Sequence, residues 1–247
     1  MTNLAYMTYS EWGQHGTAMP ENNNLIQEWL GHGPVTVAVS NLAKYQSREN
    51  GADVDAVGRI APEVRAADVV SFGQLIRQAG SNGRARRVLA VHPFGDSDLD
   101  SLRKLVAGLD AGSRVFVVVW SRHDRVVAWL EGLRALNLHT GTTHDVPDPL
   151  LVSAAELMVG EEYNSLAGGR GKDTVVQLLR AFAREGYPLD EQTWARAYFA
   201  AGGSFSHVES VVKFTKEMRD GVRHRTKPRY KDSIVEVLRD RLAADVN

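Results

Sequence analysis

Short runs of β-branched and other apolar residues alternate with helical stripes over roughly the first 150 residues. The runs are VTVAV at 35–39, RVLAV at 87–91 and RVFVVVW at 114–120. Each run predicts a buried strand, and the last one, nearly continuous in apolar residues, is typical of a strand covered on both faces. A further short strand is predicted at 136–139.

Apolar residues at helical spacing lie between these runs and predict helices over 67–79, 99–109 and 126–136. The order strand, helix, strand, helix predicts an α/β domain with a doubly wound, Rossmann-like parallel sheet and right-handed crossovers. Residues 1–34 are predicted to form an irregular lead-in with one helix near 25–30. The polar stretch at 44–59 is predicted to be a long loop.

Beyond the polar, proline-containing stretch at 139–149, the pattern predicts only helices. They are expected over 150–159, 174–185, 191–201, 207–219 and 232–244. Glycine and proline residues separate them, because glycine commonly ends a helix and proline cannot continue one. We therefore predict two domains, an α/β domain over residues 1–146 and a helical domain over residues 147–247.

The composition excludes several kinds of site. The 247 residues include no cysteine, so there are no disulfides, thiolate metal sites or cysteine nucleophiles. No run of about 18 apolar residues occurs, and the amino terminus lacks the basic and apolar pattern of a signal peptide. We therefore expect a cytoplasmic protein that has no membrane partner.

A net charge of −1 conceals one strongly basic segment. Residues 213–231 hold eight Lys and Arg against two acidic residues, a local charge of +6. The helices predicted at 191–201 and 207–219 are joined by a short glycine-bearing turn, which is a helix-turn-helix pattern leading into this segment. Ser206 and Glu209 fit a capping box at the start of the second helix.

This arrangement suits a nucleic acid, because each Lys or Arg that contacts a phosphate releases counterions and Arg can grip a phosphate with two bonds. Duplex DNA is the partner we expect. The residues predicted to contact it are Ser210, Lys213, Lys216, Arg219, Arg223, Arg225, Lys227, Arg229, Tyr230 and Lys231. The alternative is a solvated or protein-facing basic surface, since basic residues at a helix C-terminus also offset the helix dipole.

A second set of polar residues follows two of the predicted strands, where ligands bind in open α/β sheets. The set comprises His92, Asp96, Asp98, His123 and Asp124. Such groups can serve as general acids and bases or hold a divalent metal, and we expect His92, Asp96 and His123 to share one crevice. The alternative is that the aspartates only cap the next helices.

A third candidate is the glycine-rich segment Gly169, Arg170, Gly171 and Lys172, which precedes a predicted helix and would hold a phosphate on backbone amides. It is not a Walker A motif, and no GxGxxG pattern follows any predicted strand. The sequence therefore names no cofactor and no metal site.

Taken together, these patterns favour a DNA-binding regulatory protein. Its helical domain would make the contact, and its α/β domain would sense a ligand or mediate self-association into a homo-oligomer. Two other hypotheses remain open: a hydrolase or nucleotide-processing enzyme with its site at the edge of the sheet, and an adaptor that binds only protein.

Overall fold

The fold was examined in a computed structural model that describes residues 3–8, 19–79, 86–110 and 112–245. The chain packs into two compact units, one comprising residues 1–130 and 134–144 and the other residues 131–133 and 145–247. Whether a cut near residue 146 yields two independently folding domains stays a prediction.

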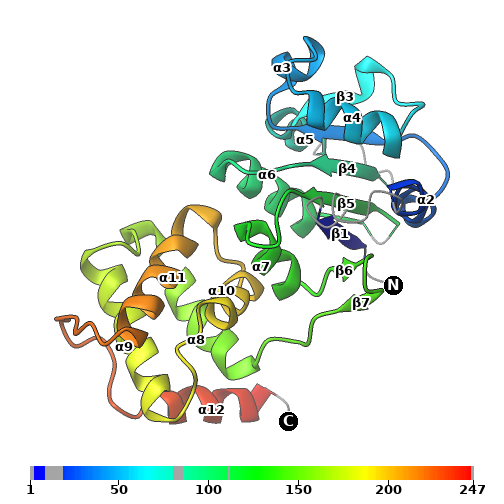
Figure 1. The fold of residues 1–247 in the computed structure, drawn as a ribbon. Helices are drawn as coiled ribbons and strands as arrows, with labels where there is room; N and C mark the ends of the chain where they lie inside the picture. The colour runs from blue at the N-terminus through cyan, green and yellow to red at the C-terminus, as the bar shows by residue number, and fades with distance from the viewer. Residues whose placement is uncertain (1–2, 9–18, 80–85, 111, 246–247) are drawn as a thin grey trace. The chain divides into compact units, whose positions relative to one another are not determined.

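The first unit contains a mostly parallel sheet. In the described residues it has seven strands: β1 (Leu4–Thr8), β2 (Thr36–Val39), β3 (Val69–Ser71), β4 (Arg87–Val91), β5 (Arg114–Val119), β6 (Leu136–Asn137) and β7 (Thr142–Thr143). Their order is β3-β2-β4-β5-β1-β6-β7, and only the β6–β7 pair is antiparallel. The predicted α/β class with a parallel sheet is thereby confirmed (Figure 1).

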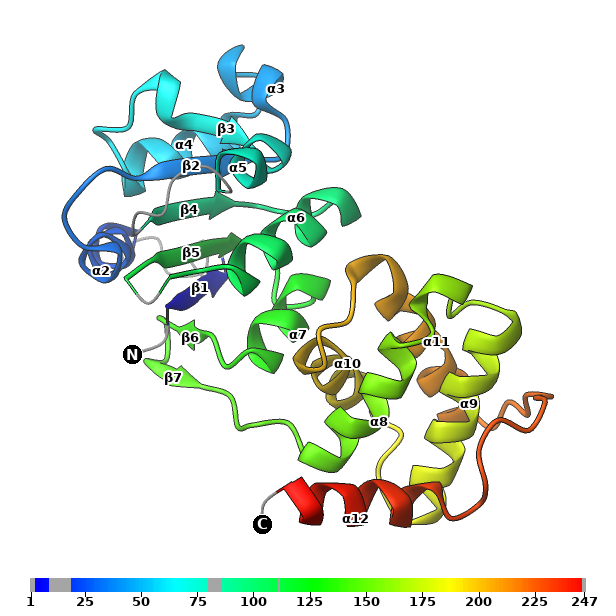
Figure 2. The same cartoon turned by 180° about the vertical axis from the view of Figure 1, so that it is seen from behind.

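Helices cover both faces of this sheet. The helices are α2 (Met19–Leu30), α3 (Leu42–Gln46), α4 (Gly51–Ile60), α5 (Phe72–Ala79), α6 (Asp96–Ala107) and α7 (Arg125–Gly132), with a 3-10 turn η1 (Ala66–Asp68). Residues of α2 and α4 pack on one face, in one buried cluster with β2, β4 and β5, and α5 packs beside α6 on the other face (Figure 1 and Figure 2). Figure 2, which views the sheet from behind, shows α4 and α5 on opposite sides, in agreement with Figure 1.

Alternate residues of the strands supply the two faces of the core. On the α2 and α4 side, Leu89 and Val91 of β4 pack with Phe116 and Val118 of β5 in a fully buried cluster. The neighbours Val88 and Ala90 are equally buried, so both faces are covered, as the apolar runs predict.

Three local predictions are wrong. The lead-in is not irregular throughout, because β1 lies inside the sheet between β5 and β6. The helix predicted near 25–30 is present but is longer, since α2 begins at Met19; residues 1–2 and 9–18 lie outside the described part. The predicted loop at 44–59 contains α3 and α4, since Ala56, Val57 and Ile60 form a buried helical stripe among polar residues. The helix predicted from residue 67 begins only at Phe72, because β3 occupies 69–71.

The second unit contains α8 (Pro149–Val159), η2 (Glu162–Asn164), α9 (Gly169–Arg184), α10 (Glu191–Ala200), α11 (Phe205–Arg219) and α12 (Ile234–Asp245). Its core is aromatic and aliphatic, with Phe182, Trp194 and Phe205 fully buried. Asp148 and Asp190 cap α8 and α10 by accepting backbone N–H bonds. The predicted capping box is wrong, because α11 starts at Phe205 and its N-cap is Ser204 rather than Ser206.

Candidate functional site

A buried histidine occupies the end of β4. The His92 backbone N–H donates to the Val118 carbonyl at 3.0 Å, which extends the pairing with β5 by one residue. Its φ of +45° is uncommon for a residue with a side chain and is typical of positions that the surrounding structure holds in place. The His92 ring packs edge-on against Trp120, with 4.9 Å between ring centroids.

The partner of His92 is Asp53 of α4, a residue that the sequence analysis missed. His92 Nδ1 and Asp53 Oδ1 are 2.5 Å apart, and both side chains are at least nine-tenths buried. Asn50 donates to the other oxygen of Asp53. Burial raises the pKa of the Tyr45 hydroxyl, and the nearby Asp53 charge raises it further. The helical spacing of Asp53 with Ala56, Val57 and Ile60 was the available sequence signal.

Ser40 joins this pair to Asp98. Ser40 follows β2, and its hydroxyl donates to the His92 carbonyl at 3.3 Å. Burial raises the pKa of the Asp98 carboxyl, and a hydrogen bond with Ser40 opposes part of that rise. The chain leaves β2 toward β3 and leaves β4 toward β5, in opposite directions, so these residues lie at a topological switch point, the usual place for ligands in open α/β sheets.

The other residues predicted at this edge have local partners. Asp96 lies in the first turn of α6 and forms an ion pair with Arg125 at 2.6 Å. The Asp124 carboxylate accepts from the Ser121 backbone N–H at 2.9 Å, and His123 in the same turn is exposed. In the described part of the chain, no three His, Asp or Glu side chains are grouped so as to hold a metal ion.

In the second unit, a ten-residue segment between α11 and α12 is held against α9 by side chains of that helix. This segment, residues 222–231, is called the basic strap. Gln177 donates to the Lys227 carbonyl and accepts from the Arg229 and Tyr230 N–H groups at 2.8 and 3.2 Å. Arg180, one helical turn further along, donates to the His224 carbonyl at 3.0 Å. The strap backbone is therefore fixed without regular secondary structure.

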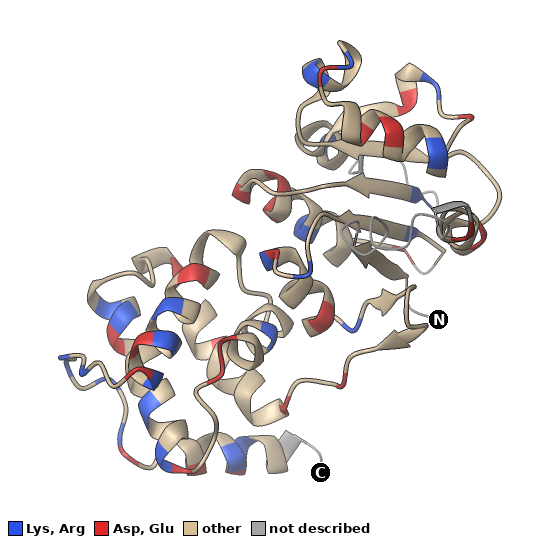
Figure 3. Ribbon diagram, in the orientation of Figure 1, with Lys and Arg blue, Asp and Glu red and all other residues tan. Residues whose placement is uncertain are grey.

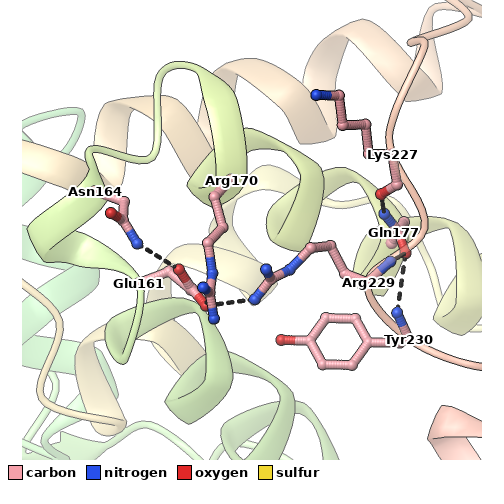
Figure 4. A network of polar contacts seen from close by, with 7 residues as sticks. All are labelled: Glu161, Asn164, Arg170, Gln177, Lys227, Arg229 and Tyr230. Carbon is pink, nitrogen blue, oxygen red and sulfur yellow. Dashed lines mark hydrogen bonds and ion pairs between the residues drawn. The ribbon is translucent and has the colours of Figure 1, made fainter.

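Arg229 and Arg170 converge on one buried carboxylate, Glu161 (Figure 4). The Arg229 and Arg170 guanidinium groups lie 2.7 and 3.0 Å from Glu161 Oε1, and Asn164 donates to Oε2 at 2.8 Å. Burial raises the pKa of the Glu161 carboxyl, but the hydrogen bonds from Asn164 and Arg170 and the charges of both arginines outweigh it and lower that pKa. The Glu161 carboxylate already supplies an anion to these two cations.

The glycine-rich segment is the first turn of α9 rather than a separate loop. Gly169 has a φ of +55°, and Gly171 is buried so closely that a Cβ would lie 2.3 Å from the Ser165 carbonyl oxygen. Gly171 therefore has a packing role and Gly169 a conformational one, whether or not the amides of this turn hold a phosphate. Lys172 lies over the Phe214 ring of α11, 6.0 Å from its centroid.

Most cations of α11 have acidic neighbours. Lys216 pairs with Asp220 at 2.7 Å, Arg219 with Glu191 at 2.8 Å, and Lys213 is 4.0 Å from Glu217. The two pairs at i,i+4 spacing, Lys216–Asp220 and Lys213–Glu217, lie near the surface and contribute little to stability. Lys213 also lies 5.9 Å from the Phe214 ring centroid, so two segments that the sequence analysis treated separately, the start of α9 and the outer face of α11, meet at Phe214. Ser210 on the same helix is partly exposed.

The strap itself carries the remaining positive charge. Arg223, Arg225, Lys227 and Lys231 are exposed, and no ion pair joins them to any described residue. No Asp or Glu occurs between Gly221 and Lys231. In Figure 3 the Lys and Arg residues of this segment appear as short blue stretches of ribbon separated by uncharged residues.

The turn between α10 and α11 is rigidly built. Gly202 has a φ of +85°, and a Cβ on Gly203 would lie 2.3 Å from the Tyr198 ring. Glu162 accepts a bond from the Tyr198 hydroxyl and another, at 2.8 Å, from the Ser204 N–H. The relative orientation of the two helices is thus set by close packing and by one carboxylate.

No protein-family model, curated protein sequence or solved structure matches this chain. None of the helices in residues 3–8, 19–79, 86–110 and 112–245 combines the length and apolarity that a membrane crossing requires.

Proposed function

We propose that the second unit binds nucleic acid, duplex DNA in particular, through the basic strap. The observation that carries this proposal is the set of four exposed cations on a backbone that Gln177 and Arg180 hold in place. A fixed backbone reduces the entropy that the segment loses on binding, so these charges can follow a row of phosphates at low cost.

The α10–turn–α11 pair supports a helix-turn-helix as the reading element. Its turn is fixed by Gly203 packing and by Glu162, and Lys213 and Ser210 lie on the outward side of α11. In this proposal the strap supplies affinity that does not depend on sequence, and α11 supplies base contacts in the major groove. The first unit then senses a ligand or mediates self-association.

The test is fluorescence anisotropy with several duplexes at three salt concentrations. Arg223→Gln combined with Arg225→Gln should weaken binding to every duplex and reduce the slope of log affinity against log salt by about two. A matched control removes two exposed cations from α12, Arg239→Gln with Arg241→Gln, and should leave the slope unchanged. Arg229 is unsuitable for this test because it also stabilises the fold through Glu161.

Two further outcomes bear on the proposal. Lys213→Ala or Ser210→Ala should alter the ranking of duplexes more than the overall affinity, because base contacts rather than phosphate contacts are lost. If the unmodified protein binds no duplex at low salt, or if the strap and control variants behave alike, the strap is a solvated or protein-binding surface and the proposal is wrong.

A second function is favoured by one specific observation, the buried His92–Asp53 pair at the switch point. An aspartate that accepts from Nδ1–H orients an imidazole and supports proton transfer at Nε2, which is the arrangement used in general acid–base catalysis. A hydrolase or nucleotide-processing activity at this edge would be lost in Asp53→Asn, whereas His123→Ala, in the neighbouring exposed turn, would retain it. Equal activity in both variants would exclude the pair from catalysis.

A further inference from the structure

A pocket of about 240 Å³ lies between α9 and the basic strap. The residues that line it include three cations, Arg180 and Arg184 from α9 and Lys231 from the strap, together with Thr226 and a single acidic residue, Asp232. We propose that this pocket binds the phosphate group of a phosphomonoester, such as a nucleoside monophosphate or the phosphorylated end of a nucleic acid strand.

The cations of the pocket are available to bind an anion. Asp232 pairs with Arg184 at 3.2 Å, but the Asp232 side chain is 98% exposed and that of Arg184 is 63% exposed. Ion pairs of this kind contribute little, so a phosphate can replace the carboxylate at small cost. Arg180 uses one N–H for the His224 carbonyl, and a guanidinium has five such donors in a planar fork that matches phosphate.

The pocket is also preorganised. Its α9 wall is regular helix, and its other wall is the strap backbone that Gln177 holds at residues 227, 229 and 230. The backbone that carries the cationic side chains is therefore already in place, which limits the entropy lost when an anion binds.

Size and charge favour a terminal phosphate over a backbone phosphate. The volume is below the roughly 300 Å³ at which sites for drug-sized ligands begin, so it suits a phosphate with part of the attached sugar. A phosphomonoester carries a charge of about −1.5 to −2 at pH 7, close to what three cations and one carboxylate can balance. A phosphodiester of a nucleic acid backbone carries a single negative charge, and the exposed cations of the strap are sufficient to bind it.

This inference does not depend on the proposed duplex binding, because Arg223 and Arg225 do not line the pocket. The experiment measures calorimetric binding of AMP and of adenosine, and compares duplexes with 5′-phosphate and 5′-hydroxyl ends. The protein should bind AMP more tightly than adenosine, or the 5′-phosphorylated duplex more tightly than the 5′-hydroxyl duplex. Arg184→Gln with Lys231→Gln should reduce that preference by about tenfold or more, the strength of one charge-assisted hydrogen bond.

The variants separate the two proposals. Arg223→Gln with Arg225→Gln should keep the preference for the phosphorylated ligand while losing overall duplex affinity, and Arg239→Gln with Arg241→Gln should change neither. A preference seen only with AMP identifies a free mononucleotide as the ligand, and one seen only with the duplex identifies a strand end. Equal binding with and without the phosphate, in both assays, would overturn the inference. So would a preference that persists in the Arg184 and Lys231 variant.

Discussion

Replacing Glu161 by alanine should destabilise the second unit far more than the loss of an ordinary surface ion pair. The Glu161 side chain is 9% exposed and that of Arg229 is 22% exposed, so the variant leaves a largely buried guanidinium without its carboxylate. Breaking a buried pair in this way costs about 3 to 5 kcal/mol. We expect about 3 kcal/mol, the lower end, because Arg170 is half-exposed and returns to water easily.

Urea denaturation followed by circular dichroism measures this loss. With a slope of about 2 kcal/mol per M, the midpoint should fall by about 1.5 M. Hydrogen exchange at the Arg229 and Tyr230 amides should also accelerate, because both donate to Gln177 only while the strap is docked. Glu185→Ala is the matched control: its pair with Arg239 is 3.6 Å long and about half exposed on each side, so its removal should cost less than about 1 kcal/mol.

The pH dependence provides an independent check on the same residue. The folded-state pKa of Glu161 lies below its ordinary value of 4.5, so its contribution to stability is fully present above that value and is lost as the pH falls through the folded-state pKa. The difference in stability between the natural chain and Glu161→Ala should therefore shrink in acid. Equal losses in the Glu161 and Glu185 variants at neutral pH would refute the view that this network holds the strap.

Two further predictions concern the α10–α11 turn and the edge of the sheet. Gly203→Ala should lower the free energy of unfolding by about 1 to 3 kcal/mol, because the new Cβ would collide with the Tyr198 ring. Gly202→Ala meets open space and should lower it by only about 1 kcal/mol, the cost of an alanine in the left-handed region. Urea midpoints of the two variants measure the difference. Burial raises the folded-state pKa of Asp98, so the folded first unit loses stability as the pH rises through that pKa and the buried carboxyl ionises. Asp98→Asn cannot ionise, so it should stabilise the first unit at pH 7 and have no effect near pH 3. Stabilisation that is equal at both pH values would contradict the second prediction.

Local pattern along the chain was enough to predict those parts of the fold in which pattern and burial coincide. β4 and β5 are nearly continuous apolar runs rich in β-branched residues, and a short run of this kind is typical of a strand covered on both faces. The same holds for α6, α8 and α10, whose apolar residues recur at helical spacing between clear end signals. The positive charge of the basic strap was also evident, because basic and acidic residues can be counted without knowing which residues lie near them in the fold.

Only the tertiary structure decided which polar side chains meet. Asp53 contacts His92, which is 39 residues away in the sequence, and Arg229 contacts Glu161, which is 68 residues away. No pattern of sequence spacing relates residues so far apart. The same packing distinguished cations within a single charged segment. Gln177 and Arg180 of α9 fix the strap backbone. In that position Arg229 pairs with a buried carboxylate, while Arg223 and Arg225 face solvent. A sequence records which charges are present, but burial and distance decide which of them remain available to a ligand.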